Sequence, residues 1–372
     1  MAMTVERRGW NSSVIVSSPP PLDLRAPRRR LGGSVELSLA ADRFGRMPAP
    51  RPLVFVTRRL PEVVERQLAE RFDVVLNERD TPPDAAALAE ALTRADALLC
   101  TVTDRLDGAV LRGAEPLRAR ILANFGVGYN HIDVTAARER GLVVTNTPGV
   151  LTDDTADVAL ALILMTARRL TEGERCLRAG AWAGWAPTQL LGMSLGGKTL
   201  GIIGLGRIGQ AVARRAHFGL GMRVRYVSRT ARPDPDAAEV GATAAPSLDA
   251  LLAESDVVSI HAPATPATRH LIDADALARM RPHAILVNTA RGDLVDEEAL
   301  AAALRAGTIA GAGLDVYERE PRVHPDLLGM ENVVLLPHLG SATRETRRAM
   351  GERALANLVA FFDGREPADR VA

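Results

Sequence analysis

Short runs of apolar, often β-branched residues alternate along the chain with Ala-, Leu- and Arg-rich stretches of helical periodicity. Such alternation is typical of parallel sheets covered by helices on both faces. It predicts two series of strands, before and after a long helix at 156–169. The first series is predicted at 53–57, 74–76, 97–102, 121–123 and 143–145, with helices at 61–71 and 83–94 between its strands. The second series is predicted at 199–203, 223–227, 257–260, 285–288, 313–316 and 333–336.

The two series predict an α/β protein with two doubly wound parallel-sheet domains. The turn cluster 146–149 marks the seam, and Asp153, Asp154 and Thr155 after it supply capping chemistry for the long helix. A last helix at 344–363 follows the second series and is expected to pack back on the first sheet. We therefore expect a discontinuous flavodoxin-like substrate domain at 52–147 and 337–372, and a Rossmann cofactor domain at 148–336.

Residues 1–51 differ from the rest of the chain. They hold nine arginines against four acidic residues, a run of three prolines at 19–21 and no sustained hydrophobic period. This composition is typical of disorder, so we interpret the segment as a disordered extension. Its apolar run at 14–16 is too short for a secretory signal. A transit peptide and a natural start at Met47 are the two alternatives.

The composition of the 372 residues, 47% hydrophobic and 24% charged, is that of a globular protein large enough for two domains. A net charge of +1 gives no electrostatic footprint for nucleic acid or a membrane surface. Lys198 is the only lysine, which argues against a Schiff-base enzyme or a Walker phosphate loop. The two cysteines, Cys100 and Cys176, and the unpaired histidines indicate no disulfide framework and no metal site. A cytoplasmic protein is expected.

A glycine motif follows the first strand of the second series. The strand at 199–203 runs directly into Gly204-Leu-Gly206-Arg-Ile-Gly209, and a helical pattern continues beyond it. In a dinucleotide site the first glycine permits the tight turn, the second admits the pyrophosphate, and the third lets the helix pack close to the strand. The motif therefore predicts a bound dinucleotide.

The next strand, at 223–227, bears on which dinucleotide is bound. NAD sites expect an acidic residue about 20 residues after the motif. Here no acid occurs from 205 to 233, whereas seven arginines do. We expect Ser228, Arg229 and Thr230 to bind the extra phosphate of NADP, with NAD as the second cofactor. The alternative is that this segment is an ordinary solvated loop.

Three residues follow strands of the second series and could form a reaction centre. Open α/β sheets bind ligands at the carboxyl ends of their strands, which is where Arg291, Glu320 and His338 are expected. Reduction of a 2-oxo acid needs a cation for the carboxylate and an acid for the developing alkoxide. Arg291 suits the first task and His338 the second, with Glu320 keeping the imidazole protonated. Taken singly, each residue also fits a loop cation, a surface charge or a turn histidine.

A glycine-containing turn at 124–133 ends a strand of the first series. Its glycines would let the backbone N–H groups of Val127 and Gly128 approach a small anion, as a nest does. We expect these two residues to bind substrate; the alternative is a structural turn.

With these motifs, the chain resembles the D-isomer-specific 2-hydroxyacid dehydrogenase family over about residues 53–365. Within the family it is most similar to the glyoxylate/hydroxypyruvate reductases, through 125–133, 184–192 and 228–230. The other matching stretches are 201–209, 287–296, 313–321 and 336–343.

The resemblance implies an NADP(H)-preferring reductase of small 2-oxo acids. It implies that Arg291 binds substrate, that His338 is the acid/base and that Glu320 is its partner. It also implies a homodimer in which the segment 182–191 reaches toward the partner. The cofactor contacts that it implies are Thr155, Arg207, Ile208, Ser228, Arg229, Thr230, Pro263, Thr268, Thr289, Ala290, Asp315 and Gly340.

Other functions on the same scaffold are a 2-ketogluconate reductase, a short-form phosphoglycerate dehydrogenase and a non-catalytic nucleotide-sensing corepressor. A corepressor would keep the glycine motif but could lose the Arg–Glu–His set, which this chain retains. Only 34 residues follow His338, which argues against a long, regulated phosphoglycerate dehydrogenase. Glu320 stands where formate dehydrogenases of this fold carry glutamine, so that activity is disfavoured.

Overall fold

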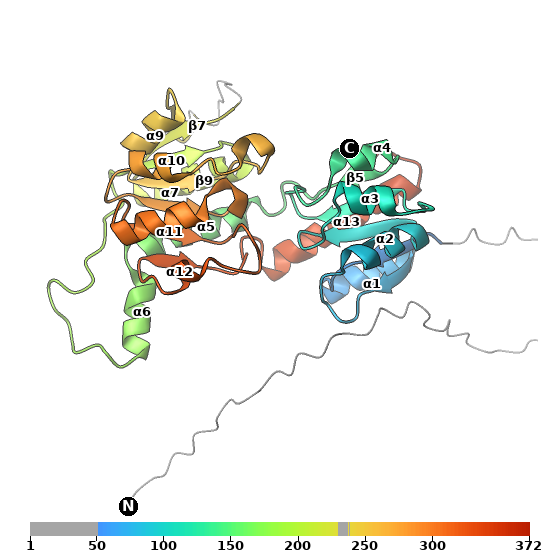
Figure 1. Ribbon diagram of the computed structural model, residues 1–372, viewed down its shortest axis with the longest axis horizontal. Helices are drawn as coiled ribbons and strands as arrows, with labels where there is room; N and C mark the ends of the chain where they lie inside the picture. The colour runs from blue at the N-terminus through green and yellow to red at the C-terminus, as the bar shows by residue number, and fades with distance from the viewer. Residues whose placement is uncertain (1–50, 230–236, 238) are drawn as a thin grey trace, which may run out of the picture. The chain divides into compact units, whose positions relative to one another are not determined.

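The computed structural model describes residues 51–229, 237 and 239–372 (Figure 1). The interpretation of 1–51 as an extension therefore lies, apart from Arg51, outside the described residues, and so does the predicted cofactor contact of Thr230. In the described part of the chain, no helix is long and apolar enough to cross a membrane.

The first sheet has five parallel strands in the order β2-β1-β3-β4-β5, which is the flavodoxin-like order. Its central strands β3 and β4 are buried along their whole length, as expected for strands covered on both faces. The strands are β1 (Leu53–Val56), β2 (Asp73–Leu76), β3 (Ala97–Thr101), β4 (Ile121–Phe125) and β5 (Val143–Thr145). The helices between them are α1 (Glu62–Arg71), α2 (Ala85–Arg94), α3 (Gly108–Gly113) and α4 (Val134–Glu139).

The end of the chain completes the layers of the first sheet. The last helix, α13 (Arg344–Phe362), packs against β4 and α1, and its red ribbon lies beside the blue and teal sheet in Figure 1. Met350, Ala354 and Leu358 of this helix share one apolar core with the strands. Val144 of β5 donates its N–H to the carbonyl of Ala372 at 2.9 Å. The packing is that expected for the last helix, while the domain boundaries stay a prediction.

The second sheet has seven parallel strands in the order β12-β11-β10-β9-β6-β7-β8, which is the Rossmann order extended by one strand. The strands are β6 (Thr199–Ile203), β7 (Arg223–Val227), β8 (Thr243–Ala244), β9 (Val257–Ile260), β10 (Ile285–Asn288), β11 (Gly311–Leu314) and β12 (Val333–Leu335). The helices are α5 (Thr152–Ala167), α6 (Leu170–Arg178), α7 (Arg207–Leu220), α9 (Leu248–Glu254), α10 (Ala274–Arg279), α11 (Glu297–Ala306) and α12 (Pro325–Leu328), with short 3₁₀ turns at Pro266–Thr268 and Gly292–Leu294.

Two apolar cores cover the two faces of the second sheet. One core joins the sheet to α5 and α7, and the other joins it to α9, α10 and α11. Every described strand pair in both sheets is parallel. The predicted fold class, α/β with two doubly wound parallel sheets, is confirmed.

The predicted cap of the long helix is wrong. The helix α5 begins at Thr152, and its N-cap residue Leu151 makes no side-chain cap hydrogen bond. Asp153 and Asp154 lie instead in the first turn, where their negative charges interact favourably with the helix dipole. Asp153 pairs with Arg215 of α7 at 2.9 Å, so this carboxylate joins the helix to its neighbour.

The apolar pattern did not predict two features of the strands. β8 has only two residues, both exposed, so it carries no hydrophobic signal. β11 begins at Gly311, two residues before its predicted start, because Gly311 pairs with Ile285 of β10. Glycine has no side chain to contribute to a strand pattern.

Candidate active site

His338 and Glu320 form a hydrogen-bonded pair at the carboxyl ends of two adjacent strands. His338 follows β12 and Glu320 follows β11, and the strands are parallel neighbours. Nδ1 of His338 lies 2.9 Å from Oε2 of Glu320, and the two side chains are 29% and 33% exposed. His338 has a φ of +56°, a region that residues other than glycine rarely adopt, so the surrounding contacts hold a strained backbone.

The contacts of Glu320 keep it ionised. Its Oε1 accepts the N–H of Tyr317 at 3.1 Å. Burial by itself would raise the pKa of Glu320, but the hydrogen bond and charge of His338, the Tyr317 N–H and the charge of Arg291 together hold that pKa below its ordinary value. An ionised Glu320 accepts the Nδ1–H of His338, which leaves Nε2 as the ring nitrogen for proton transfer.

Asp315 and Thr155 fix the loop that carries His338 through hydrogen bonds to its backbone. Asp315 is 1% exposed, and its two oxygens accept the N–H groups of Leu339 and Gly340 at 2.6 and 2.8 Å. The hydroxyl of Thr155 donates to the carbonyl of Gly340 at 2.9 Å. Burial raises the pKa of Asp315, although these N–H bonds oppose the rise. The predicted cofactor contacts of Asp315 and Thr155 stay predictions. In the structure these two residues hold the loop that carries His338.

Tyr317 joins the two loops of the pair. Its hydroxyl donates to the carbonyl of Leu336 at 2.9 Å, which connects the segment after β11 to the segment after β12. Burial of the phenol raises the pKa of Tyr317 well above its ordinary value, so the hydroxyl keeps its proton. Sequence reasoning missed this residue, and no pattern could have found it, because its partner is a backbone carbonyl.

Arg291 follows β10, and its side chain makes two hydrogen bonds within the described residues. Its Nε donates to Oδ1 of Asn130 at 2.9 Å, and its Nη1 donates to the carbonyl of Ala290 at 2.6 Å. Burial lowers the pKa of Arg291, while the charges of Glu320 and Asp293 act in the opposite direction. An arginine with a lowered pKa is still a cation at neutral pH.

The turn after β4 lies against the guanidinium of Arg291. A Cβ atom placed on Gly128 would stand 1.9 Å from Nη2 of Arg291, so a larger residue there would displace the guanidinium. Asn146 donates to the carbonyl of Val127 at 2.8 Å, while the N–H groups of Val127 and Gly128 have no partner among the described residues. Neither residue has a positive φ, so the turn is not a nest of the αR-αL kind, and binding of an anion by these two N–H groups stays a prediction. The structure thus brings the predicted substrate residues together.

The glycine motif has the geometry that a dinucleotide needs. Gly204 has a φ of +96°, and a Cβ on Gly209 would stand 2.2 Å from the carbonyl oxygen of Gly204. A Cβ on Gly206, in contrast, would meet nothing within 4 Å, so space is open in front of the α7 N-terminus. No acidic residue lies in the first turn of α7. These residues therefore fit the pyrophosphate of a dinucleotide.

The other predicted cofactor residues follow the carboxyl ends of strands in the same sheet. Ser228 and Arg229 are exposed just after β7, and Arg229 forms no ion pair within the described residues. Thr268 donates its hydroxyl to the carbonyl of Pro263 at 2.8 Å, in the loop after β9. The rest of the set occupies the start of α7 (Arg207 and Ile208) and the segment after β10 (Thr289 and Ala290).

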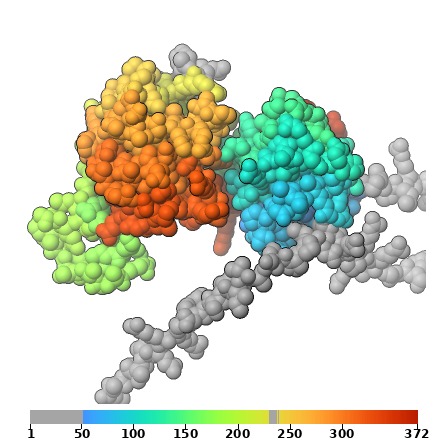
Figure 2. Space-filling view, in the orientation of Figure 1, coloured from blue at the N-terminus to red at the C-terminus, as the bar shows by residue number. Residues whose placement is uncertain are grey.

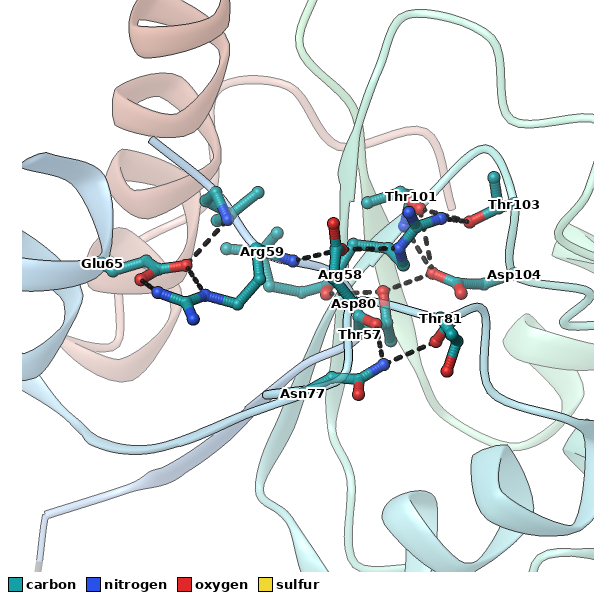
Figure 3. A network of polar contacts seen from close by, with 12 residues as sticks. Thr57, Arg58, Arg59, Glu65, Asn77, Asp80, Thr81, Thr101, Thr103 and Asp104 are labelled. Atoms are coloured by element: carbon teal, nitrogen blue, oxygen red, sulfur yellow. Dashed lines mark hydrogen bonds and ion pairs between the residues drawn. The ribbon is translucent and has the colours of Figure 1, made fainter. Parts of the chain in front are cut away.

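A polar network fixes the carboxyl end of the first sheet (Figure 3). Asp104 is fully buried, and its Oδ2 accepts the Thr57 hydroxyl at 2.5 Å and the Thr101 N–H at 2.6 Å. Oδ1 of Asp104 has no partner within the described residues, and burial raises the pKa of this carboxyl. Beside it, Arg58 donates to Asp80 at 2.9 Å and to Thr103 at 3.2 Å. The network holds the loop after β3, next to the turn after β4.

Comparison with known proteins places the chain in a family. The model described as "D-isomer specific 2-hydroxyacid dehydrogenase, NAD binding domain" matches residues 160–340. The glyoxylate reductase of Thermococcus litoralis is 46% identical over 325 residues, which cover 86% of this chain and 97% of that protein. The glyoxylate reductase of Korarchaeum cryptofilum is 48% identical over 324 residues, with coverages of 86% and 96%.

Solved structures agree with this placement. The NADPH-dependent glyoxylate/hydroxypyruvate reductase of Sinorhizobium meliloti, in complex with NADP and malonate, has a TM-score of 0.77 and 41% identity over 87% of this chain and 97% of that one. A protein from Thermus thermophilus has a TM-score of 0.78 and 46% identity over 86% and 100%. On its fold, its motifs and these similarities, the chain is an oxidoreductase that belongs to the D-isomer-specific 2-hydroxyacid dehydrogenase family.

Proposed function

We propose that this protein reduces small 2-oxo acids, glyoxylate or hydroxypyruvate first, to D-2-hydroxy acids, and that it prefers NADPH. The observation that carries the proposal is the His338–Glu320 pair at 2.9 Å, at the same end of the sheet as Arg291 and the glycine motif. Relatives named glyoxylate reductase, 46% and 48% identical over most of the chain, support the choice of substrate.

In the proposed reaction, different residues of the protein bind the substrate and transfer the proton. Arg291 binds the carboxylate and polarises the carbonyl, with the N–H groups of Val127 and Gly128 as further donors. His338 donates a proton from Nε2 to the developing alkoxide, and ionised Glu320 stabilises the imidazolium before that step. The reduced nicotinamide, when bound, supplies the hydride.

The dinucleotide would be held along the carboxyl edge of the second sheet. Gly204, Gly206 and Gly209 admit the pyrophosphate to the N-terminus of α7. Arg229, exposed and without an ion pair in the described part of the chain, is available for the extra phosphate of NADP. The other predicted contacts complete the site: Thr155, Arg207, Ile208, Ser228, Thr230, Pro263, Thr268, Thr289, Ala290, Asp315 and Gly340.

We further propose that the protein is a homodimer in a cytoplasmic location. Large apolar side chains are exposed on α6 and on the segment after it, among them Leu177 at 60%, Trp185 at 82% and Leu191 at 65%. This light-green region stands out from the layers of the second sheet in Figure 2. Apolar surface of this kind is typical of an interface, which fits the segment 182–191 predicted to reach a partner.

The proposed reaction is tested by the absorbance of NADPH in purified protein offered glyoxylate, hydroxypyruvate, pyruvate and phosphohydroxypyruvate in turn. We expect the highest kcat/KM with glyoxylate or hydroxypyruvate and a lower value with NADH. Highest activity with phosphohydroxypyruvate would instead indicate the short-form phosphoglycerate dehydrogenase. If NADPH binds tightly but is not oxidised with any of the four acids, the nucleotide-sensing alternative is favoured.

A further inference from the structure

Asn130 is the one residue of the first sheet's loops that has a side-chain hydrogen bond to Arg291 within the described residues. The two residues are 161 positions apart: Asn130 lies in the turn after β4, and Arg291 lies after β10 of the other sheet. Oδ1 of Asn130 accepts the Nε–H of Arg291 at 2.9 Å. This contact links the two sheets at the residue to which we assign the substrate carboxylate.

The contacts around Arg291 define the plane of its guanidinium. Asn130 takes the Nε–H on one edge, and the carbonyl of Ala290 takes an Nη1–H at 2.6 Å. The backbone of Gly128 lies against Nη2, where a Cβ would be 1.9 Å away. Within the described residues, both N–H groups of Nη2 are left without a hydrogen-bond partner. A planar donor fork held this way is already oriented for a planar anion.

His131, the next residue, makes no hydrogen bond that would compete with Asn130 for Arg291 within the described residues. Both of its ring nitrogens are shielded from solvent and have no partner within the described residues. Burial, and then the charge of Arg291, lower the pKa of His131 to about 4, so the ring is neutral at neutral pH. A neutral His131 ring therefore adds no second positive charge near Arg291.

We propose that Asn130 is a positioning residue for the substrate carboxylate. Its amide oxygen orients the guanidinium of Arg291, and the same hydrogen bond holds the N–H groups of Val127 and Gly128 beside that guanidinium. The carboxylate then meets donors from both sheets in one fixed arrangement. Because the donors are already held in place, less conformational entropy is lost when substrate binds. The inference rests on the proposed function, because it takes Arg291 as the carboxylate ligand.

Three substitutions separate the hydrogen bond from the shape of the side chain. Asn130→Leu keeps the approximate shape without an acceptor, Asn130→Ala removes both, and Asn130→Gln keeps a neutral amide acceptor on a longer side chain. We expect KM for glyoxylate to rise at least about fivefold in the Leu and Ala variants and to return toward the wild-type value in the Gln variant. Because Asn130 is exposed, the melting temperature should hardly change. Asn332→Ala, a substitution of another exposed asparagine, is the matched control.

Binding of oxalate, a planar dicarboxylate that cannot be reduced in this reaction, gives a readout apart from turnover. With NADPH present, calorimetry should show weaker oxalate binding in Asn130→Leu by the same factor as the rise in KM, and unchanged NADPH affinity. Equal oxalate affinity and equal KM in the Leu, Gln and wild-type proteins would overturn the positioning role alone. A wild-type protein that neither reduces a 2-oxo acid nor binds oxalate would overturn the proposed function, and this inference with it.

Discussion

Nδ1 of His338 lies 2.9 Å from Oε2 of Glu320, and the two residues reach each other from loops after neighbouring parallel strands. The contact depends on support from outside the pair. The N–H of Tyr317 binds the carboxylate, and Asp315 holds the backbone after His338. The geometry of the proton donor is therefore set by buried backbone contacts as well as by the pair itself.

Replacement of His338 by Gln should lower kcat about a hundredfold or more, because the proton for the alkoxide then has no positioned donor. NADPH affinity should stay within about twofold, since the glycine motif is untouched. Steady-state kinetics and a fluorescence titration of NADPH measure the two quantities. His283→Gln, at an exposed histidine that is hydrogen-bonded to the buried Asp256, is the matched control. Unchanged turnover in His338→Gln would remove the imidazole from the mechanism.

Glu320→Gln should remove a stabilising charge whose effect depends on pH. The pKa of Glu320 in the folded protein lies below its ordinary value of 4.5, so the carboxylate stabilises the fold above that value and loses the effect as pH falls through the lowered pKa. The free energy of unfolding of the wild type, minus that of Glu320→Gln, should therefore decrease as pH falls below about 4.5. Urea unfolding at several pH values measures it. A difference that does not vary with pH would contradict the pKa assignment.

The sequence was sufficient for the fold because its strongest signals are local. Apolar strands such as 199–203 and 257–260 were predicted with their observed bounds, since buried parallel strands form uninterrupted apolar runs. The errors fall where the signal is weak. β8 is short and exposed, Gly311 adds nothing to a pattern, and Asp153 resembles a cap although the helix begins before it.

The candidate site was predictable only in part. Strand order brings Glu320 and His338 together, so knowing that each follows a strand was enough to expect the pair. The partners of these residues were not predictable, because they act through backbone groups or across the two sheets. Asn130 stands in the recognised turn 124–133, yet only the structure shows its amide on Arg291.

Asp104→Asn tests the polar network of Figure 3. Burial raises the pKa of Asp104 above its ordinary value of 3.8, so its contribution to stability is fully present below pH 3.8 and is lost as pH rises through the raised pKa. Asparagine does not ionise, so the free energy of unfolding of the wild type relative to Asp104→Asn should fall over that window and then level off. Chemical denaturation across the acidic range measures the curve. A relative stability that rises with pH would mean that the carboxyl ionises readily in the folded protein.

Arg229→Ala should weaken NADPH binding about tenfold or more and leave NADH binding almost unchanged, because only NADPH carries the phosphate that this guanidinium would bind. Dissociation constants for both dinucleotides measure the change. Arg223→Ala removes another exposed arginine, at the amino end of β7, and should affect neither cofactor. Equal weakening of both dinucleotides would show that Arg229 acts on the part that they share.

Trp185→Glu should dissociate the proposed dimer. The side chain is 82% exposed in the single chain, and Leu191 nearby in sequence is 65% exposed, so a partner that covers them would bury two large apolar groups. A charge at position 185 would then have to be desolvated in the interface, which is costly without a partner charge. Light scattering after size exclusion should give the mass of a dimer for the wild type and of a monomer for Trp185→Glu. Phe218→Glu, at a 64% exposed phenylalanine of α7, is the control for surface charge alone. A dimer that persists in Trp185→Glu would place the interface elsewhere on the surface.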